Sequence, residues 1–506
     1  MHIVKKENRF FENRSSGILL HPASLPGLWG IGTMGQEAFG FIDKLSEAGV
    51  KYWQMLPLTP TGMGNSPYQS WSAFAGNTMF ICPRELKKEK LLPEDLNPEE
   101  LFPVSQSKFI DYNHAHNAVD FFTQLAHRTF LQSNILRDEF LQFREKHHYW
   151  LEDFALFAAI RNQLKEIPVQ KWPSLLRERD EEALLKKRRE LSEQIELEEF
   201  SQFLFFRQWF KLKEYANSKG VLLIGDLPIY VSTDSVEVWI SHELFEVDAG
   251  LNPVFVAGVP PDYFSETGQL WGNPVYNWKK HESNNFQWWQ QRLEFALKMF
   301  DAVRIDHFRG FSDYWTIPAD EKTAEKGQWK NAPGKLLFET IIQKHSHLPV
   351  IAEDLGELSD EAVELREHFG FPGMKILQFA FANPEENLFL PHFYDKNCVV
   401  YTGTHDNNTS RGWIEEDVLP EEKEFALEYL SCSEEDFSEN FLRLGWSSVA
   451  NTVIVPLQDL FSLDSSARMN TPGTESNNWL WKMNAEQLVN FPVDKLKKLN
   501  RLFGRE

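Results

Sequence analysis

The sequence has few cysteines, no long apolar run and no excess of basic residues. Only 3 of the 506 residues are cysteines, and Cys82, Cys398 and Cys432 lie far apart along the chain. This spacing argues against a disulfide framework or a zinc site, so we expect a reducing compartment. No segment approaches the ~18 consecutive apolar residues of a transmembrane helix. The first residues are polar and lack the apolar core of a signal peptide, so we expect a cytoplasmic protein.

The net charge of −22 argues against nucleic acid or an anionic membrane as a partner. The basic run 186–189 is most simply a solvated helix face. A neutral ligand fits the charge better. The 17 Trp and 41 Phe residues fit stacking on sugar faces, although an ordinary large core explains most of them equally well.

Short apolar segments alternate with helical patterns along the chain, which is typical of a (β/α)8 barrel. We predict eight parallel strands at 16–22, 50–58, 221–227, 302–306, 350–354, 374–381, 399–404 and 451–457. The chain exceeds a minimal barrel of about 250 residues by about as much again. We therefore predict an α/β TIM barrel with large, mostly helical insertions after strands two and three.

This reading divides the chain into five parts. Residues 1–77 hold strands one and two, 78–215 a helical insertion subdomain, 216–229 strand three, 230–290 a second insertion, and 291–506 the rest of the barrel and a C-terminal segment. The second insertion is expected to be a long loop. Glycines flank aromatic residues in its segment 258–274, which suggests a mobile lid, although an ordinary long loop has the same composition.

Several predicted strands end in acidic residues. Asp226, Asp306 and Glu353 occupy the ends of strands three, four and five, and Asp406 follows strand seven. The active sites of such barrels lie at the carboxyl ends of the strands, and convergent carboxylates without metal ligands suggest glycosidic-bond chemistry. Arg304 shares a strand face with Asp306 and should keep it ionised, although a purely structural ion pair has the same pattern.

Eight motifs in this order resemble the amylomaltases, also called disproportionating enzymes or 4-α-glucanotransferases, of the α-amylase superfamily. The motifs are SPYQ (66–69), GDLPIYV (225–231), GVPPDYFSETGQLWGNPVYNW (258–278), RIDHFRGF (304–311), AEDLG (352–356), PGMKILQFAF (372–381), GTHDN (403–407) and ARMNTPGT (467–474). α-Amylases usually have an Asn-His pair shortly after the strand-three Asp. Here Asp226 is followed by Leu-Pro-Ile-Tyr, which is the amylomaltase form.

The resemblance implies a role for each matching residue. Asp306 would be the nucleophile, Glu353 the general acid/base and Asp406 the transition-state stabiliser. The adjacent Asp354 is an alternative acid, but strand alternation turns only one of the pair inward. The implied substrate-binding residues are Tyr68, Asp226, Tyr263, Phe264, Trp271, Arg304, His405 and Asn470, with Tyr263 and Phe264 in the lid.

The implied reaction transfers α-1,4-glucan segments between malto-oligosaccharides, or to glucose, by a retaining double displacement through a covalent glycosyl-enzyme. No metal or organic cofactor is expected, because the acids perform the whole reaction. Two alternatives stay open at this point. One is a hydrolase of the same superfamily, and the other is a non-catalytic glycan-binding barrel.

Overall fold

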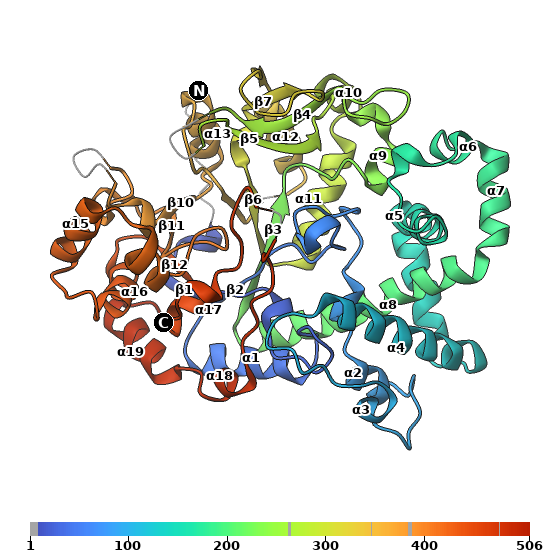
Figure 1. Ribbon diagram of the computed structural model, residues 1–506, viewed down its shortest axis with the longest axis horizontal. Coiled ribbons are helices and arrows are strands. Elements are labelled where there is room, and N and C mark those ends of the chain that lie inside the picture. Colours follow the sequence, from blue (N-terminus) through green and yellow to red (C-terminus); the bar gives the residue numbers. More distant parts are fainter. Residues whose placement is uncertain (1–8, 262–264, 346, 383–386, 475) are drawn as a thin grey trace.

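Eight parallel strands form the centre of the molecule, as a computed structural model shows for residues 9–261, 265–345, 347–382, 387–474 and 476–506 (Figure 1). Their order in the sheet is β10-β11-β12-β1-β2-β3-β6-β9. The two ends of the sheet meet, because the backbone N–H of Ala352 in β9 donates to the carbonyl of Pro372, just before β10, at 2.9 Å. The strands are β1 (Ser15–Leu19), β2 (Tyr52–Gln54), β3 (Leu222–Pro228), β6 (Ala302–Asp306), β9 (Val350–Ala352), β10 (Gly373–Ile376), β11 (Cys398–Tyr401) and β12 (Thr452–Pro456). The predicted α/β barrel class is confirmed.

The barrel strands are apolar runs because protein covers both of their faces. Every residue of β1, β2, β9, β11 and β12 is buried. All eight predicted strands are present, several of them shorter than expected. The segment predicted at 374–381 ends as a strand at Ile376 and continues as a 3-10 turn over Leu377–Phe379.

A group of helices lies between β2 and β3, at the right of Figure 1. These are α2 (Pro83–Lys88), α3 (Pro98–Leu101), α4 (Tyr112–Gln132), α5 (Arg137–Gln163), α6 (Ser174–Arg177), α7 (Glu181–Glu190) and α8 (Ser192–Ser218). Aromatic rings join the two longest, since the ring of Phe143 in α5 lies 5.7 Å from those of Phe203 and Phe206 in α8. The subdomain boundaries proposed for 78–215 and 230–290 stay predictions.

A second sheet replaces the long loop that the sequence led us to expect after β3. Its antiparallel order is β5-β4-β7-β8, from β4 (Phe255–Val259), β5 (Gln269–Pro274), β7 (Asp313–Pro318) and β8 (Gln328–Asn331). The strands β7 and β8 follow β6, so this sheet also adds an insertion after the fourth barrel strand that the sequence did not indicate. Local patterns missed it because β4 pairs with β7 across the intervening barrel strand β6.

The remaining helices surround the barrel, and most of them come from the part of the chain after β3. They are α1 (Gln36–Glu47), α9 (Val236–Ile240), α10 (Trp278–Ser283), α11 (Gln287–Met299), α12 (Gly334–Ile342), α13 (Asp360–Phe369), α14 (Ser410–Gly412), α15 (Pro420–Leu430), α16 (Phe437–Ser447), α17 (Leu457–Leu460), α18 (Ala485–Val489) and α19 (Val493–Phe503). Among the described residues, none of the helices is both long and apolar enough to cross a membrane.

The C-terminal residues bind the amino-terminal ends of the barrel strands, opposite the end where the acidic residues lie. Arg505 is fully buried and donates hydrogen bonds to the carbonyls of Ser15 at the start of β1 and Asn451 before β12, at 3.1 and 3.0 Å. Further bonds from Arg505 reach carbonyls of 446–450. The last helix is thereby fixed to the strands that begin and end the barrel chain.

Candidate active site

The pairing of β3 with β6 brings two acids to the same arginine. In this parallel register Asp226 lies opposite Arg304, and Pro228 lies opposite Asp306. The guanidinium of Arg304 donates to Asp226 through Nε at 3.1 Å and through Nη2 at 2.9 Å. The same Nη2 donates to Oδ1 of Asp306 at 2.7 Å. Arg304 and Asp306 thus share a strand face, as the alternation of the strand predicts.

The two acids bound to Arg304 differ in exposure. The side chain of Asp226 is 0% exposed, and its Oδ2 also accepts the hydroxyl of Tyr68 at 2.6 Å. The side chain of Asp306 is 31% exposed. Asp226 therefore serves as the buried counter-ion of Arg304, whereas Asp306 is open to a ligand.

Arg304 does not by itself keep Asp306 ionised, which differs from the expectation drawn from the sequence. Burial, together with the charges of Asp226, Glu353 and Asp406, raises the pKa of Asp306 to about 8, against the opposing effect of Arg304. One guanidinium faces more carboxyl groups than it can neutralise. These carboxyl groups are therefore expected to titrate as a coupled set and not independently.

Glu353 directly follows β9, and the turn after β6 holds it on both its main chain and its side chain. Its N–H donates to the carbonyl of Ile305, and its own carbonyl accepts from Phe308, each at 3.0 Å. Its carboxyl oxygens accept the N–H groups of His307 at 2.6 Å and Leu355 at 3.0 Å. Burial raises the pKa of Glu353, and Arg304 and these two N–H bonds act in the opposite direction.

The neighbouring Asp354 has separate partners. Its Oδ2 accepts from Arg366 and its Oδ1 from the N–H of Met374, both at 2.7 Å. Strand alternation predicted that only one of the pair turns inward, and these contacts place Glu353, not Asp354, beside the turn that follows Asp306.

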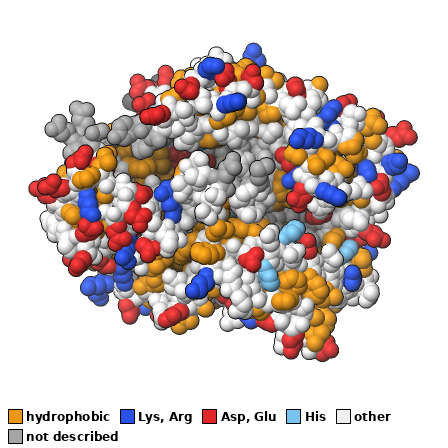
Figure 2. All heavy atoms as spheres, in the orientation of Figure 1, with side chains coloured by type: hydrophobic (Ala, Val, Ile, Leu, Met, Phe, Trp, Pro, Cys, Tyr) orange, Lys and Arg blue, Asp and Glu red, His pale blue; other side chains and the backbone are white. Residues whose placement is uncertain are grey.

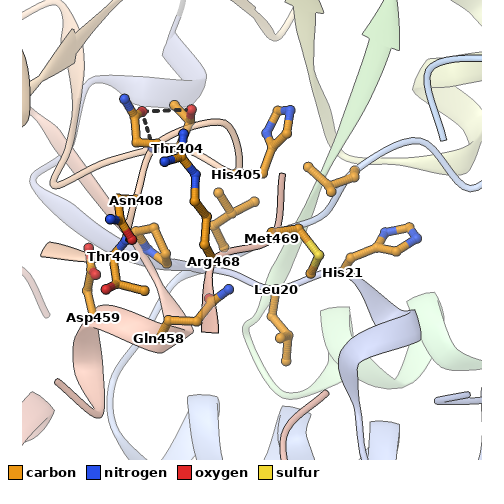
Figure 3. A pocket seen from close by; sticks show the side chains of 14 residues that line it. Leu20, His21, Thr404, His405, Asn408, Thr409, Gln458, Asp459, Arg468 and Met469 are labelled. Carbon is orange, nitrogen blue, oxygen red and sulfur yellow. Dashed lines mark hydrogen bonds between the residues drawn. The ribbon is translucent and has the colours of Figure 1, made fainter. Parts of the chain in front are cut away.

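Asp406 lies in the loop after β11, and the C-terminal segment holds it. Its Oδ1 accepts from Nδ2 of Asn470 at 2.6 Å and lies 3.4 Å from Nε2 of His405. The main-chain carbonyl of Asp406 accepts from Arg468 at 2.9 Å, and Figure 3 shows Arg468 extending toward the Thr404 turn. The Asp406 side chain is 46% exposed, so this carboxylate is also open to a ligand.

His405 is a buried, neutral ring on the wall between these groups. It stacks on Tyr68, with ring centroids 5.1 Å apart and planes 12° apart. Burial lowers the pKa of His405, although Asp406 opposes that effect. Because Tyr68 also bonds to Asp226, one stack of side chains connects the loops after β2 and β11 with the end of β3.

Comparison with known proteins places this arrangement in a family. Residues 20–488 match the family model described as 4-alpha-glucanotransferase. The chain is 47% identical to the 4-alpha-glucanotransferase of Thermus thermophilus over 480 residues, which are 93% of this chain and 95% of the relative. It is 44% identical to that of Clostridium butyricum over 489 residues, 96% of this chain and 100% of the relative.

This chain belongs to the 4-alpha-glucanotransferase family. A solved structure agrees, namely the amylomaltase from Streptococcus agalactiae in complex with acarbose. The two share 42% identity with a TM-score of 0.92, over 97% of this chain and 99% of that one. The predicted resemblance to the amylomaltases is confirmed, and with it the assignment as a hexosyltransferase.

The segment predicted as a lid is only partly described in this 4-α-glucanotransferase. Tyr263 and Phe264 lie outside the described residues. Trp271 lies in β5, and its ring meets that of His307 edge to face, with centroids 4.8 Å apart. This contact places Trp271 next to the turn that binds Glu353.

Sequence reasoning missed three contributors to the site of this 4-α-glucanotransferase. Trp479 packs its ring against His405 and Tyr68, with centroids 5.8 and 6.0 Å away. Arg468 binds the main chain of Asp406, and His307 binds Glu353 through its N–H. Arg468 lay inside a recognised motif, but nothing local marked Trp479, which comes from a distant C-terminal segment. The role of His307 depends on its backbone and has no signal in side-chain chemistry.

The site opens on a hollowed face of this 4-α-glucanotransferase. Figure 2 shows a hollow near the middle of the face, over the region where Figure 1 places β3 and β6. Acidic and basic side chains are interspersed around it. A pocket behind His405 is lined by Leu20, His21, Thr404, Arg468 and Met469 among others (Figure 3).

Proposed function

We propose that this 4-α-glucanotransferase moves α-1,4-glucan segments from a malto-oligosaccharide donor to another malto-oligosaccharide or to glucose, by double displacement with retention. The observation that supports it best is the position of Asp306 and Glu353 at the carboxyl end of the barrel. One acid is bonded to Arg304, and the other is held by main-chain N–H groups. A retaining reaction needs such a pair, one carboxyl to attack and one to transfer the proton.

In the first step, Oδ of Asp306 attacks the anomeric carbon of the donor sugar. As the glycosidic C–O bond breaks, Glu353 gives its proton to the leaving oxygen and the shortened chain departs with a free 4-hydroxyl. In the second step, the 4-hydroxyl of an acceptor attacks the glycosyl-enzyme, its proton passes to Glu353, and Asp306 is released. Atoms and charges balance over the cycle, so the carboxyl groups need no metal or cofactor.

This mechanism requires that the two carboxyl groups differ in protonation state before the first step. Asp306 must be ionised to attack, while Glu353 must be protonated. Burial raises the pKa of both groups. We propose that donor binding brings the glycosidic oxygen to Glu353 and so favours the proton on Glu353, while Arg304 stabilises the negative charge on Asp306.

We assign Asp406 and His405 to the ring hydroxyls of the sugar that reacts. About half of the Asp406 side chain is exposed, and Asn470 orients the carboxylate by donating a hydrogen bond to its Oδ1. A neutral His405 ring offers a hydrogen bond without adding charge. Contacts to these hydroxyls would strengthen as positive charge develops on the sugar ring in the transition state.

Transfer instead of hydrolysis requires that a sugar, and not water, reaches the glycosyl-enzyme. Trp271 lies beside the turn that contains His307, where its ring could stack on the acceptor sugar. Tyr263 and Phe264 stay predicted as parts of the lid.

We also keep the cytoplasm as the proposed compartment, which the three free cysteines support. Among the relatives, the potato protein is named as chloroplastic or amyloplastic.

Incubation with pure maltotriose tests the proposal. Chain lengths and total reducing ends are followed over time. We expect glucose together with a ladder of products longer than maltotriose, at constant reducing ends. Rising reducing ends with only shorter products would show a hydrolase, and no turnover at all, also with longer donors, would show a glycan-binding protein.

A further inference from the structure

His307 adopts a backbone conformation that is uncommon for a residue other than glycine. Its φ and ψ are 52° and 53°, in the left-handed region that glycine occupies freely and other residues rarely do. Such a conformation is strained for a non-glycine residue and persists where the surroundings enforce it. It occurs here one residue after Asp306.

The consequence of this conformation is a pair of N–H groups directed at one residue. The N–H of His307 meets Oε2 of Glu353 at 2.6 Å, and the N–H of Phe308 meets the Glu353 carbonyl at 3.0 Å. The turn therefore fixes both the backbone and the carboxyl of Glu353.

The imidazole of His307 has a different neighbour. Its ring lies edge to face against Trp271, and burial lowers the pKa of His307 to about 4, so the ring is neutral. His307 thus contacts Glu353 through its main chain. Its ring contacts Trp271, the proposed stacking surface for the acceptor sugar.

We propose that His307 is a positioning residue for Glu353, acting through its left-handed backbone and not through its imidazole. The N–H aimed at Oε2 fixes the orientation from which Glu353 gives and takes the proton. The inference rests on the proposed role of Glu353 as acid/base, and it names the backbone feature that makes that role effective.

Three substitutions separate the backbone from the ring. His307→Gly keeps the left-handed conformation without strain and removes the ring, and His307→Asn keeps it nearly as well. His307→Val opposes it, because a β-branched residue is poorly tolerated there. With maltotriose as donor, we expect kcat to fall by about 3-fold or less in His307→Gly and His307→Asn, and by ~30-fold or more in His307→Val.

A donor with an activated leaving group distinguishes mispositioning of Glu353 from general damage. Fluoride departs from α-maltosyl fluoride with little help from an acid, so its release in the first turnover depends mainly on Asp306. We expect His307→Val to release fluoride within ~5-fold of the wild-type rate, while its activity on maltotriose stays low. The basic limb of its pH profile should also shift, whereas that of His307→Gly should resemble the wild type.

Two controls complete the test. Ser431→Val places the same strain at another left-handed position, φ 50°, at the end of α15, and should lower thermal stability without changing the ratio of the two donor activities. Glu353→Gln should also release fluoride. If Glu353→Gln does so but His307→Val does not, or if His307→Gly loses as much as His307→Val, the inference about His307 is wrong. If Glu353→Gln releases no fluoride, the assigned role of Glu353 is wrong instead.

Discussion

Replacing Asp226 by Asn tests whether a buried counter-ion controls Asp306, the proposed nucleophile. Asp226 and Asp306 share Nη2 of Arg304, with bonds of 2.9 and 2.7 Å, and Asp226 is the fully buried partner. In Asp226→Asn the amide keeps the shape of the side chain, and its oxygen can still accept from Nη2 of Arg304 and from Tyr68, but its NH2 group then faces Nε of Arg304. One charge-assisted hydrogen bond is lost, worth about 1.5–3 kcal/mol.

The loss acts on the reaction through Arg304. Without its buried partner, the guanidinium binds Asp306 more strongly, which makes the nucleophile less basic and slows its attack. If the whole loss is expressed in the transition state, kcat falls by about 10- to 150-fold. Initial rates of glucose release from maltotriose measure it.

The pH dependence of kcat/KM in Asp226→Asn provides an independent test, because the direction in which its acid limb shifts can be predicted. Protonated Asp306 cannot attack, so activity is lost as the pH falls through the pKa of Asp306. The charge of Asp226 is one of the causes that raise this pKa to about 8. Removing that charge lowers the pKa, so the acid limb of kcat/KM should move to lower pH.

Asp301→Asn is the matched control, because Asp301 immediately precedes β6 at the other end of the strand and binds Asn217 and the N–H of Leu223. It should leave the acid limb in place. An Asp226→Asn variant that is folded and retains kcat within ~3-fold, or whose acid limb moves to higher pH, would show that Asp226 does not control Asp306.

Three further outcomes are expected. Tyr68→Phe removes the 2.6 Å bond to Asp226 but keeps the ring on His405, so kcat should fall about 10-fold with little change in KM, and an unchanged kcat would contradict this. Asn470→Ala removes the 2.6 Å bond to the half-exposed Asp406, which water partly replaces, so kcat/KM for maltotriose should fall only about 5-fold, and a loss above ~100-fold would show that Asn470 does more. Arg505→Ala removes the Arg505 donor from the carbonyl of Ser15, whereas the carbonyl of Asn451 keeps the N–H of Ser15, and Arg14 still serves those of Ser448 and Ala450. Urea titration should therefore show a free energy of unfolding lower by about 1–3 kcal/mol, and an unchanged midpoint would contradict that.

The barrel strands could be predicted because a strand buried on both faces is a short apolar run, and the helices between them have their own period. Asp306 and Glu353 could be located because each stands where such a run ends. The β4–β7 pairing was not predictable in the same way, since its partners are separated by a whole barrel strand and two helices. Trp479 was missed for a similar reason, because it reaches Tyr68 and His405 from more than 70 residues further along the chain than either.

Local periodicity and motifs that are contiguous in the chain were sufficient to predict the fold class and the family, and to nominate the candidate acids. How each acid affects the others, by contrast, depends on the three-dimensional arrangement of the strands and loops. Asp226 and Asp306 are the same residue type on adjacent strands, yet one is sealed behind Tyr68 and the other is open. Their difference arises from burial and from distances to Arg304, and these depend on strand register and on loops packed from remote parts of the chain.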